Sequence, residues 1–328
     1  MNPIDISIII ISYNTKEILR ECLQITLKEI KSLNCEVIVV DNNSKDNSAD
    51  MVASEFPQVR LIRSGRNLGF GGANNLGFLQ TSGKYIVFLN SDAFLKPDVL
   101  LKAFQKMEED PEIGLAGAKL VGQDGSWQPS ARQFPSLLND FLQFSGLAAR
   151  FSQSRFFGKG DRTWASPLEA TKTDWVPGAF AIARRDLLKQ LNCFDERFFL
   201  YSEEVDLCKR IKKLGYQIWY WPDLVVIHLG GESAKKVANQ SFSTTGSQLT
   251  LWSMRSLLLY YRKHHGFLRT YFRMVLEIWW HKLRIIKNYW FADPVHKAKV
   301  AESSALILLL RQAWHETQGG QESPPRPW

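Results

Sequence analysis

The stretch Ile6-Ser7-Ile8-Ile9-Ile10-Ile11-Ser12 is almost entirely apolar and β-branched. A strand without polar alternation has both faces covered, which is typical of a parallel sheet between helices. Helical spacing follows over residues 15–32, and a second apolar run, Glu36 to Val40, ends at Asp41. The order strand, helix, strand therefore predicts a βαβ opening.

The alternation of helices and strands continues further along the chain. Helices are predicted over 46–56, 72–81 and 200–213, and strands over 59–62, 85–89 and 217–229. This order predicts an α/β domain whose mostly parallel central sheet is flanked by helices and binds ligands at the carboxyl ends of its strands. Periodicity weakens over residues 122–174, where we expect a long functional loop region within the same domain.

Composition limits the possible classes of protein but does not identify one. At 328 residues with 45% hydrophobic residues the chain can bury a sizeable core, so global disorder is not expected. A formal net charge of +8 favours anionic partners, which include nucleic acid, an acidic membrane surface and a phosphorylated substrate. Eleven tryptophans, several beside Lys, Arg or His near the C-terminus, are typical of contact with lipid headgroups.

The cysteines and the apolar runs indicate a cellular compartment. Cys22, Cys35, Cys193 and Cys208 are scattered, with no CxxC pair, so we interpret them as small buried residues in a reducing compartment. The first residues lack a basic segment followed by a long apolar stretch, so no export signal is expected. No apolar run reaches about 18 residues, so no spanning helix is predicted and the expected location is cytoplasmic.

Polar residues follow each of four predicted strands. They are Ser12-Tyr13-Asn14, Asp41-Asn42-Asn43-Ser44, the segment Arg66-Asn67-Leu68-Gly69-Phe70-Gly71-Gly72-Ala73-Asn74-Asn75, and Asn90-Ser91-Asp92. Each alone could be a turn closed by an Asn or Asp side chain. Their occurrence at successive strand ends favours a ligand-binding edge of the sheet.

The glycine-rich segment suits a diphosphate. It brings backbone N–H groups to a helix start, and Arg66 supplies positive charge. A dinucleotide-binding domain would carry its glycines after the first strand, with an acidic residue about 20 positions later. Here the glycines follow the third strand, which argues against a nicotinamide dehydrogenase.

Five segments follow one another along the chain: Asp41-Asn42-Asn43-Ser44, Asn67-Leu68-Gly69-Phe70 with Asn74-Asn75, Asn90-Ser91-Asp92, Ser202-Glu203-Glu204-Val205-Asp206-Leu207, and His228-Leu229-Gly230-Gly231-Glu232-Ser233. Together they resemble family 2 glycosyltransferases with a GT-A fold, in particular the bacterial rhamnosyltransferase-like branch. The resemblance covers Ile6 to Ser233, and Tyr260 to Gly266 extends it into the C-terminal region.

The resemblance implies a donor site for a nucleoside-diphosphate sugar. Asp41 would hydrogen-bond the nucleobase, with Ser12 and Asn14 lining the same pocket. The implied nucleotide-sugar-binding residues are Ser12, Asn14, Asp41, Asn43, Arg66, Asn67, Gly69, Asn75, Asn90 and Ser91.

A metal site is also implied. Asn90-Ser91-Asp92 stands where the family carries its DxD-type motif, so Asp92 would bind Mg²⁺ or Mn²⁺, and His228 would complete the metal shell. Asn90 departs from the family pattern, because an amide adds no negative charge at the first acidic position. The alternatives are a helix N-cap for Asp92 and a purely structural role for His228.

The acceptor side needs a base that takes the proton of a hydroxyl. By the resemblance Glu204 is that base, with Glu203 as its substitute, and Trp175 and Gly178 lie on the acceptor side. Asp206 is expected to cap or pair within the helix. The alternative for the acidic triplet is a helix N-terminal turn favoured by the helix dipole.

The residue pattern of the C-terminal region differs from that of the preceding part of the chain. We predict a GT-A nucleotide-sugar-binding and catalytic domain over 1–240, a basic amphipathic helical extension over 241–318 and a disordered tail over 319–328. The apolar positions of the extension recur near the helical period and are Trp252, Leu258, Tyr261, Leu268, Phe272, Val275, Trp279, Leu283 and Ile286. They could pack on the catalytic domain, dock on anionic lipid, or do both.

The expected function is an inverting, metal-dependent glycosyltransferase for cell-surface polysaccharide synthesis. The donor is a nucleoside-diphosphate sugar, with rhamnose as the candidate, and the acceptor is a glycan or lipid-linked hydroxyl at the inner face of the cell membrane. Nucleic acid is not expected as a partner, and a homo-oligomer is left open. The alternatives are a sugar nucleotidyltransferase, which should carry a glycine-rich basic loop after its first strand, and a non-enzymatic glycan-binding module, which leaves the acidic motifs unexplained.

Overall fold

The computed structural model describes residues 3–30, 33–231 and 247–324. The chain divides into two compact units. The first comprises Met1–Phe134, Asp161–Glu196 and Glu203–Val237, and the second comprises Pro135–Gly160, Arg197–Ser202 and Ala238–Trp328. The predicted boundary at residues 240 and 241 lies outside the described residues.

The first unit is built on one sheet with the strand order β3-β2-β1-β4-β9-β6-β10-β5. Its long strands are β1 (Ile6–Ser12), β2 (Cys35–Asp41), β3 (Arg60–Arg63), β4 (Tyr85–Asn90), β6 (Ile113–Val121), β9 (Phe180–Arg184) and β10 (Gln217–His228). Strands β3, β2, β1 and β4 are mutually parallel, as are β6 and β10, while β9 runs antiparallel between β4 and β6. The prediction of an α/β fold with a mostly parallel sheet is confirmed.

Three short antiparallel strands extend the sheet: β5 (Ala93–Leu95) and β8 (Thr171–Thr173) pair with β10, and β7 (Trp127–Gln128) pairs with β6. Two of them, β7 and β8, lie in the stretch 122–174, for which the sequence predicts a loop region. The same stretch also contains α5 (Leu137–Phe144) and α6 (Leu147–Arg150), which cluster with the second unit. The expectation of one loop region within a single domain is therefore wrong for residues 135–160.

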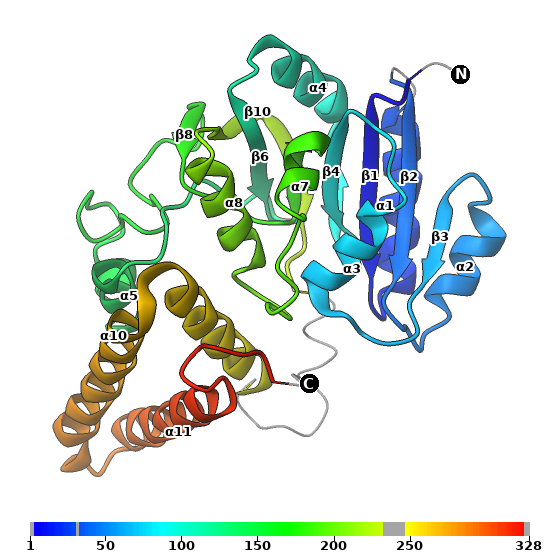
Figure 1. Ribbon diagram of the computed structural model, residues 1–328. Helices are drawn as coiled ribbons and strands as arrows, with labels where there is room; N and C mark the ends of the chain where they lie inside the picture. Colours follow the sequence, from blue (N-terminus) through cyan, green and yellow to red (C-terminus); the bar gives the residue numbers. More distant parts are fainter. Residues whose placement is uncertain (1–2, 31–32, 232–246, 325–328) are drawn as a thin grey trace. The chain divides into compact units, whose positions relative to one another are not determined.

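Helices cover both faces of the sheet (Figure 1). They are α1 (Lys16–Glu29), α2 (Ser48–Glu55), α3 (Gly69–Phe78), α4 (Val99–Glu109), α7 (Arg185–Gln190) and α8 (Glu203–Lys213). Ile8 of β1 belongs to the core cluster with α1, α2 and α4, whereas Ile9 belongs to the cluster with α3, α7 and α8. The continuous apolar run of β1 thus has the physical cause predicted for it, because successive side chains enter opposite cores.

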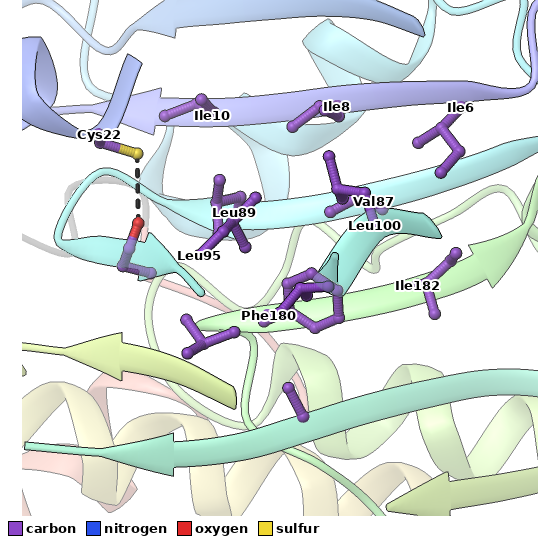
Figure 2. Packing of buried hydrophobic residues seen from close by; sticks show 14 of the residues in the cluster. Ile6, Ile8, Ile10, Cys22, Val87, Leu89, Leu95, Leu100, Phe180 and Ile182 are labelled. Atoms are coloured by element: carbon purple, nitrogen blue, oxygen red, sulfur yellow. Dashed lines mark hydrogen bonds between the residues drawn. The ribbon is translucent and has the colours of Figure 1, made fainter. Parts of the chain in front are cut away.

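Four isoleucines of β1, Ile6, Ile8, Ile9 and Ile10, are fully buried, and Ile11 is partly buried. Burying one such side chain contributes about 1.5–3 kcal/mol relative to leaving it exposed. Ile8 pairs in register with Val37 and Val87 on its two neighbours. Figure 2 shows the row on this face, which consists of Ile6, Ile8, Ile10, Val87, Leu89, Phe180 and Ile182.

The second unit is helical. Its long elements are α10 (Ser247–Tyr289), which is interrupted at Gly266, and α11 (Pro294–Glu316). Gly266 has φ 79° and ψ 177°, a conformation that glycine adopts at little cost and that ends one helix and starts the next. Asp293 caps α11 by accepting hydrogen bonds from the backbone N–H groups of Val295 and His296. The predicted helical extension is confirmed.

The apolar pattern of α10 divides between core and surface. Leu258 packs in a core with residues of α11, and Trp252 and Tyr261 are also buried. In contrast, six of the predicted apolar positions are exposed: Leu268, Phe272, Val275, Trp279, Leu283 and Ile286. Among the described residues, no helix has the length and apolar character needed to cross a membrane.

Polar contacts tie other segments into the second unit. Arg273 of α10 is buried and lies 3.0 Å from a carboxylate oxygen of Asp140 in α5. The segment Arg197–Ser202 packs on α10 through the ring of Phe199, which lies 5.0 Å from Trp252, and the Ser256 hydroxyl donates to the Leu200 carbonyl. This segment is therefore held by the C-terminal helices.

The start of the predicted disordered tail is folded. Residues 319–322 form turns in which the Gly319 N–H donates to the Trp314 carbonyl at 2.8 Å. A Cβ atom on Gly320 would lie 2.3 Å from the carbonyl oxygen of Leu258, so only glycine fits this approach. Residues 325–328 lie outside the described part of the chain.

Candidate active site

The carboxyl ends of β1, β2 and β4 meet at one edge of the sheet because these strands are parallel and adjacent. Ser12 is in register with Asp41, and Ile11 is in register with Asn90. The Asn42 N–H also donates to the Ser12 carbonyl at 2.8 Å. The polar segments that the sequence places after these strands thus share this edge.

Asp41 is buried at the end of β2. Its Oδ2 accepts a hydrogen bond from the Ser44 N–H at 3.1 Å, which closes a short turn. Its Oδ1 is also buried and has no hydrogen-bond partner among the described residues. A buried acceptor without a partner is costly, so Oδ1 suits an N–H donor brought by a ligand.

Asn14 joins the loop after β1 to the loop after β2. Its N–H donates to the Ser44 hydroxyl at 3.0 Å, and its Oδ1 accepts from the Lys45 N–H at 2.7 Å. Both Asn14 and Asn43 have positive φ, at 55° and 67°, a region where Asn is tolerated better than most residues. Ser12 is fully buried, and its hydroxyl lies 3.3 Å from that of Thr15. This contact stabilises the start of the loop after β1.

The side chains of Asn42 and Asn67 fix the start of α3. The Asn42 amide donates to Asn67 Oδ1 at 2.8 Å, and that same oxygen accepts from the Gly69 N–H at 2.9 Å. Asn42 Oδ1 in turn accepts from the Leu68 N–H. Gly69 has φ 71° and begins the helix, so the glycine-rich segment does bring a helix N-terminus to this edge, with exposed Arg66 just before it.

Asn75 is placed differently from its predicted donor-binding role. Its amide donates to the Phe194 carbonyl at 2.9 Å and to a Glu196 carboxylate oxygen at 3.1 Å, while its Oδ1 accepts from the Phe194 N–H. The side chain therefore braces the segment before residue 197 rather than facing the carboxyl edge. This contact joins positions far apart in the chain, and the local pattern around Asn75 does not reveal it.

Asp92 and His228 lie together because β5 and β10 pair with Ala93 opposite His228. The Leu229 N–H donates to the Asp92 carbonyl at 3.1 Å, and Nε2 of His228 lies 3.5 Å from Asp92 Oδ1. Ser91 beside them is buried and accepts a hydrogen bond from the Thr15 hydroxyl. Gly230 and Gly231 follow with positive φ, and Glu232 and Ser233 of the predicted motif lie outside the described residues.

Gln128 orients the imidazole of His228. Its Oε1 lies 2.9 Å from Nδ1, and its Nε2 donates to the His228 backbone carbonyl at 2.8 Å. An amide oxygen only accepts, so Nδ1 carries a proton, and in a neutral ring this places the lone pair on Nε2, the atom that faces Asp92. Within the described chain, Nε2 is buried and has no hydrogen-bond partner.

This pair fits a divalent cation as two of its ligands. One carboxylate oxygen and one neutral imidazole nitrogen suit Mn²⁺, and an oriented histidine is the usual arrangement at metal sites. Among the described residues, no group of three or more His, Cys, Asp or Glu side chains could hold a metal ion. Within the described part of the chain, Asp92 and His228 are thus the residues that would hold the ion.

Glu203 and Glu204 begin α8, directly after two residues in the left-handed region. Tyr201 and Ser202 have φ values of 69° and 66°, an uncommon conformation that is concentrated at functional sites. Each of the two carboxylates has one buried oxygen without a hydrogen-bond partner in the described chain. Asp206 pairs with Arg210 at 2.7 Å within the helix, as predicted.

Both carboxyl groups are perturbed. Burial, and after it the charge of Glu204, hold the pKa of Glu203 well above its usual range. Burial also raises the pKa of Glu204, although backbone N–H donation and the charge of Arg132 oppose the shift. Raised carboxyl pKa values are typical of groups that exchange protons near neutral pH.

The predicted acceptor residues are partly occupied by packing. The Trp175 indole N–H donates to the Gln133 carbonyl at 2.9 Å, and the Arg132 guanidinium lies 5.0 Å from the Trp175 ring. A Cβ atom on Gly178 would lie 3.0 Å from the ring of Phe70, so Gly178 leaves room for this ring. No sequence pattern singles out Arg132, which contacts the Trp175 ring and whose charge lowers the pKa of Glu204.

Comparison with known proteins identifies the family. A family model described as Glycosyl transferase family 2 matches residues 7–191. The N-acetylglucosaminyl-diphospho-decaprenol L-rhamnosyltransferase of Mycobacterium tuberculosis is 31% identical over 211 residues, which cover 58% of this chain and 66% of that protein, slightly less than two thirds. The rhamnosyltransferase WbbL of Escherichia coli K12 is 25% identical over 266 residues, which cover 77% of this chain and 91% of WbbL.

The fold is also that of a solved structure. The mannosyltransferase PcManGT from Pyrobaculum calidifontis, in complex with GDP-Man and Mn²⁺, matches with a TM-score of 0.53 and 15% identity over 95% of this chain and 88% of that one. This likeness, together with the sheet order, confirms the predicted GT-A fold. The chain belongs to glycosyl transferase family 2.

Proposed function

We propose that the chain is an inverting, metal-dependent glycosyltransferase. It would move a sugar from a nucleoside-diphosphate donor to a hydroxyl of a glycan or lipid-linked acceptor. The observation that carries this proposal is the pair Asp92 and His228, whose Nε2 is buried and oriented by Gln128 without a hydrogen-bond partner among the described residues. Family membership supports the same reaction class.

The donor would bind along the carboxyl edge of the sheet. Asp41 would receive the nucleobase N–H on Oδ1, beside the loops that contain Asn14 and Asn43. The diphosphate would lie near the N-terminus of α3 at Gly69, with Arg66 adding positive charge, and Asn90 and Ser91 would line the path to the metal. Mn²⁺ or Mg²⁺ held by Asp92 and His228 would neutralise charge that develops on the departing diphosphate.

Glu204 is the proposed base. It would take the proton of the acceptor hydroxyl as that oxygen bonds to the anomeric carbon and the bond from that carbon to the diphosphate breaks. The raised pKa of its carboxyl supports proton uptake near neutral pH. Glu203 is the substitute, because its carboxyl is adjacent and similarly perturbed.

Rhamnose is the proposed donor sugar, and cell-surface polysaccharide synthesis the proposed setting. The names of the Mycobacterium tuberculosis and Escherichia coli relatives support this choice. One of those relatives acts on a decaprenol-linked sugar, which supports a lipid-linked acceptor here. The enzyme would accordingly work at the inner face of the cell membrane as a peripheral protein.

Donor binding tests the proposal directly. Purified protein is titrated with UDP-, dTDP- and GDP-sugars with and without Mn²⁺, and unfolding temperature is followed, because a ligand that binds the native state raises it. One nucleotide class should stabilise the protein only with the metal present, and Asp92→Asn should remove that effect. Stabilisation that ignores the metal, or that survives in Asp92→Asn, would contradict the proposed site.

A further inference from the structure

One face of α10 carries an uninterrupted row of exposed apolar side chains. We call it the α10 stripe, and it consists of Leu268, Phe272, Val275, Trp279, Leu283, Ile286 and, just past the helix end, Trp290. Successive members are three or four residues apart, so they lie on one side of the helix. Leu268 is 79% exposed, Trp279 59% and Trp290 85%.

The α10 stripe is not needed to form the core of this unit, because the opposite side of the same helix is already buried there. Met274 packs in the apolar cluster with α11, and Arg273, Glu277 and His281 are buried between the helices of this unit. One side of the helix is therefore buried in the folded unit, whereas the side that carries the α10 stripe is exposed. A contiguous exposed apolar surface of this kind marks a binding surface in soluble proteins.

The charges around the stripe have one sign. Arg269, Lys282 and Lys287 are exposed and flank the row. The only carboxylate between residues 266 and 291 is that of Glu277, which is buried and lies 2.6 Å from a guanidinium nitrogen of Arg273. The surface thus offers an apolar centre with a positive border, which complements an anionic partner.

We propose that the α10 stripe docks on an anionic lipid bilayer, with this half of α10 lying in the plane of the headgroups. Trp279, Tyr289 and Trp290 are aromatic residues that carry a polar N–H or O–H group, the type enriched at the boundary between headgroup and acyl chain. From Leu268 to Trp290 the helix extends about 33 Å, so the stripe gives a long shallow contact rather than a spanning segment. This inference deepens the proposed function by naming the membrane surface as a partner. It rests on the proposed function, which supplies the reason for the enzyme to bind a membrane.

The test compares matched substitutions in the full chain. In the stripe variant, Phe272, Trp279 and Ile286 are each replaced by Ser, and the control is Leu308→Ser, which changes a 65% exposed leucine of α11 outside the stripe. A second variant, Lys282→Glu with Lys287→Glu, reverses the border charge. Binding is measured by co-sedimentation with vesicles of equal parts phosphatidylcholine and phosphatidylglycerol, and with phosphatidylcholine alone.

Wild-type protein and Leu308→Ser should bind the anionic vesicles, and the stripe variant should bind at least about tenfold more weakly. The charge variant should lose its preference for phosphatidylglycerol and its sensitivity to salt. Unchanged binding of the stripe variant, or equal loss in Leu308→Ser, overturns the proposal. Conversion of an oligomer to a monomer with vesicle binding intact also overturns it, because the stripe would then be an interface between copies.

Two further measurements separate this proposal from the enzymatic one. The stripe variant should retain its unfolding temperature and its metal-dependent donor binding, which shows that the fold is intact. Transfer to a water-soluble acceptor should be unchanged in it, whereas transfer to an acceptor embedded in vesicles should fall. Failure of the enzymatic proposal would instead abolish transfer in every variant while leaving vesicle binding as described.

Discussion

The Nε2 atom of His228 lies 3.5 Å from a carboxylate oxygen of Asp92, although the two residues are far apart in the chain. The antiparallel pairing of β5 with β10 causes this proximity, because it sets Ala93 opposite His228. Six of the twelve residues assigned by resemblance to the donor and metal lie at or directly beside a strand end: Ser12, Asp41, Asn90, Ser91, Asp92 and His228. The register of the strands therefore determines which of the predicted donor and metal residues lie close together.

Removing the metal carboxylate should abolish metal-dependent donor binding. Asp92→Asn keeps the shape and loses the negative charge, so affinity for Mn²⁺ in the presence of nucleotide should fall by about 100-fold or more. Titration calorimetry with nucleoside diphosphate measures this. The control is Asp186→Asn, which neutralises an exposed aspartate of α7 and should leave binding unchanged.

Gln128 should act through His228 as a positioning residue. Gln128→Leu removes the acceptor for Nδ1–H and should lower Mn²⁺ affinity about 10–100-fold, the usual effect of losing the partner of a metal-ligating histidine. Gln128→Glu keeps an acceptor at that atom and should recover most of the affinity. Rescue by Gln128→Glu, with equal unfolding temperatures for the two variants, distinguishes this role from general destabilisation. Equal affinity in Gln128→Leu and wild type would contradict the role.

Replacing the proposed base should separate binding from transfer. Glu204→Gln should bind the donor normally and lose about 10²–10⁴-fold in transfer rate, the usual contribution of a general base. In wild type, transfer should increase with pH through a range above that of an ordinary carboxyl, because the pKa of Glu204 is raised and the base must be ionised. If Glu203→Gln alone shows the larger loss, the base is Glu203.

The buried Glu203 carboxyl should make stability depend on pH. Its pKa is higher in the folded protein, so the folded state keeps a proton that the unfolded state releases, and the free energy of unfolding should fall as pH rises above about 4.3 towards the folded pKa. Glu203→Gln should weaken this dependence, leaving the part that comes from the raised pKa of Glu204, and should raise stability at neutral pH by about 1–3 kcal/mol. Thermal unfolding across pH measures the effect, and a variant that is less stable than wild type at neutral pH would show that the carboxylate is compensated.

The sequence predicts strands and strand ends well because the signal is local. The apolar run of β1, and the polar residues directly after β1, β2 and β4, are visible without any knowledge of tertiary contacts. Gln128 is not, since β7 is only two residues long and reaches His228 through its pairing beside β6. Asn75 and Gly178 are similar cases, because their neighbours Phe194 and Phe70 come from other segments.

The second unit shows the same limit for a helix. The spacing of apolar residues in α10 predicts an amphipathic helix correctly, but it cannot say which part is covered. Leu258 and Phe272 occur in the same kind of pattern, yet the first is buried against α11 and the second is exposed. The packing of α11 against Leu258 accounts for this burial, and the local apolar pattern does not show it.

The segment Arg197–Ser202 folds with the C-terminal helices, and the next residue in the chain is Glu203. Truncation at residue 240 would thus remove the Trp252 ring and the Ser256 hydroxyl, which contact Phe199 and Leu200. A loss of turnover in such a shortened protein would therefore not by itself indicate a role for lipid. A chimera that takes the helical part from one family member and the rest from another should therefore take residues 135–160 and 197–202 together with that helical part. A hybrid that joins the parts at residue 240 alone would pair the loop preceding the base with foreign helices.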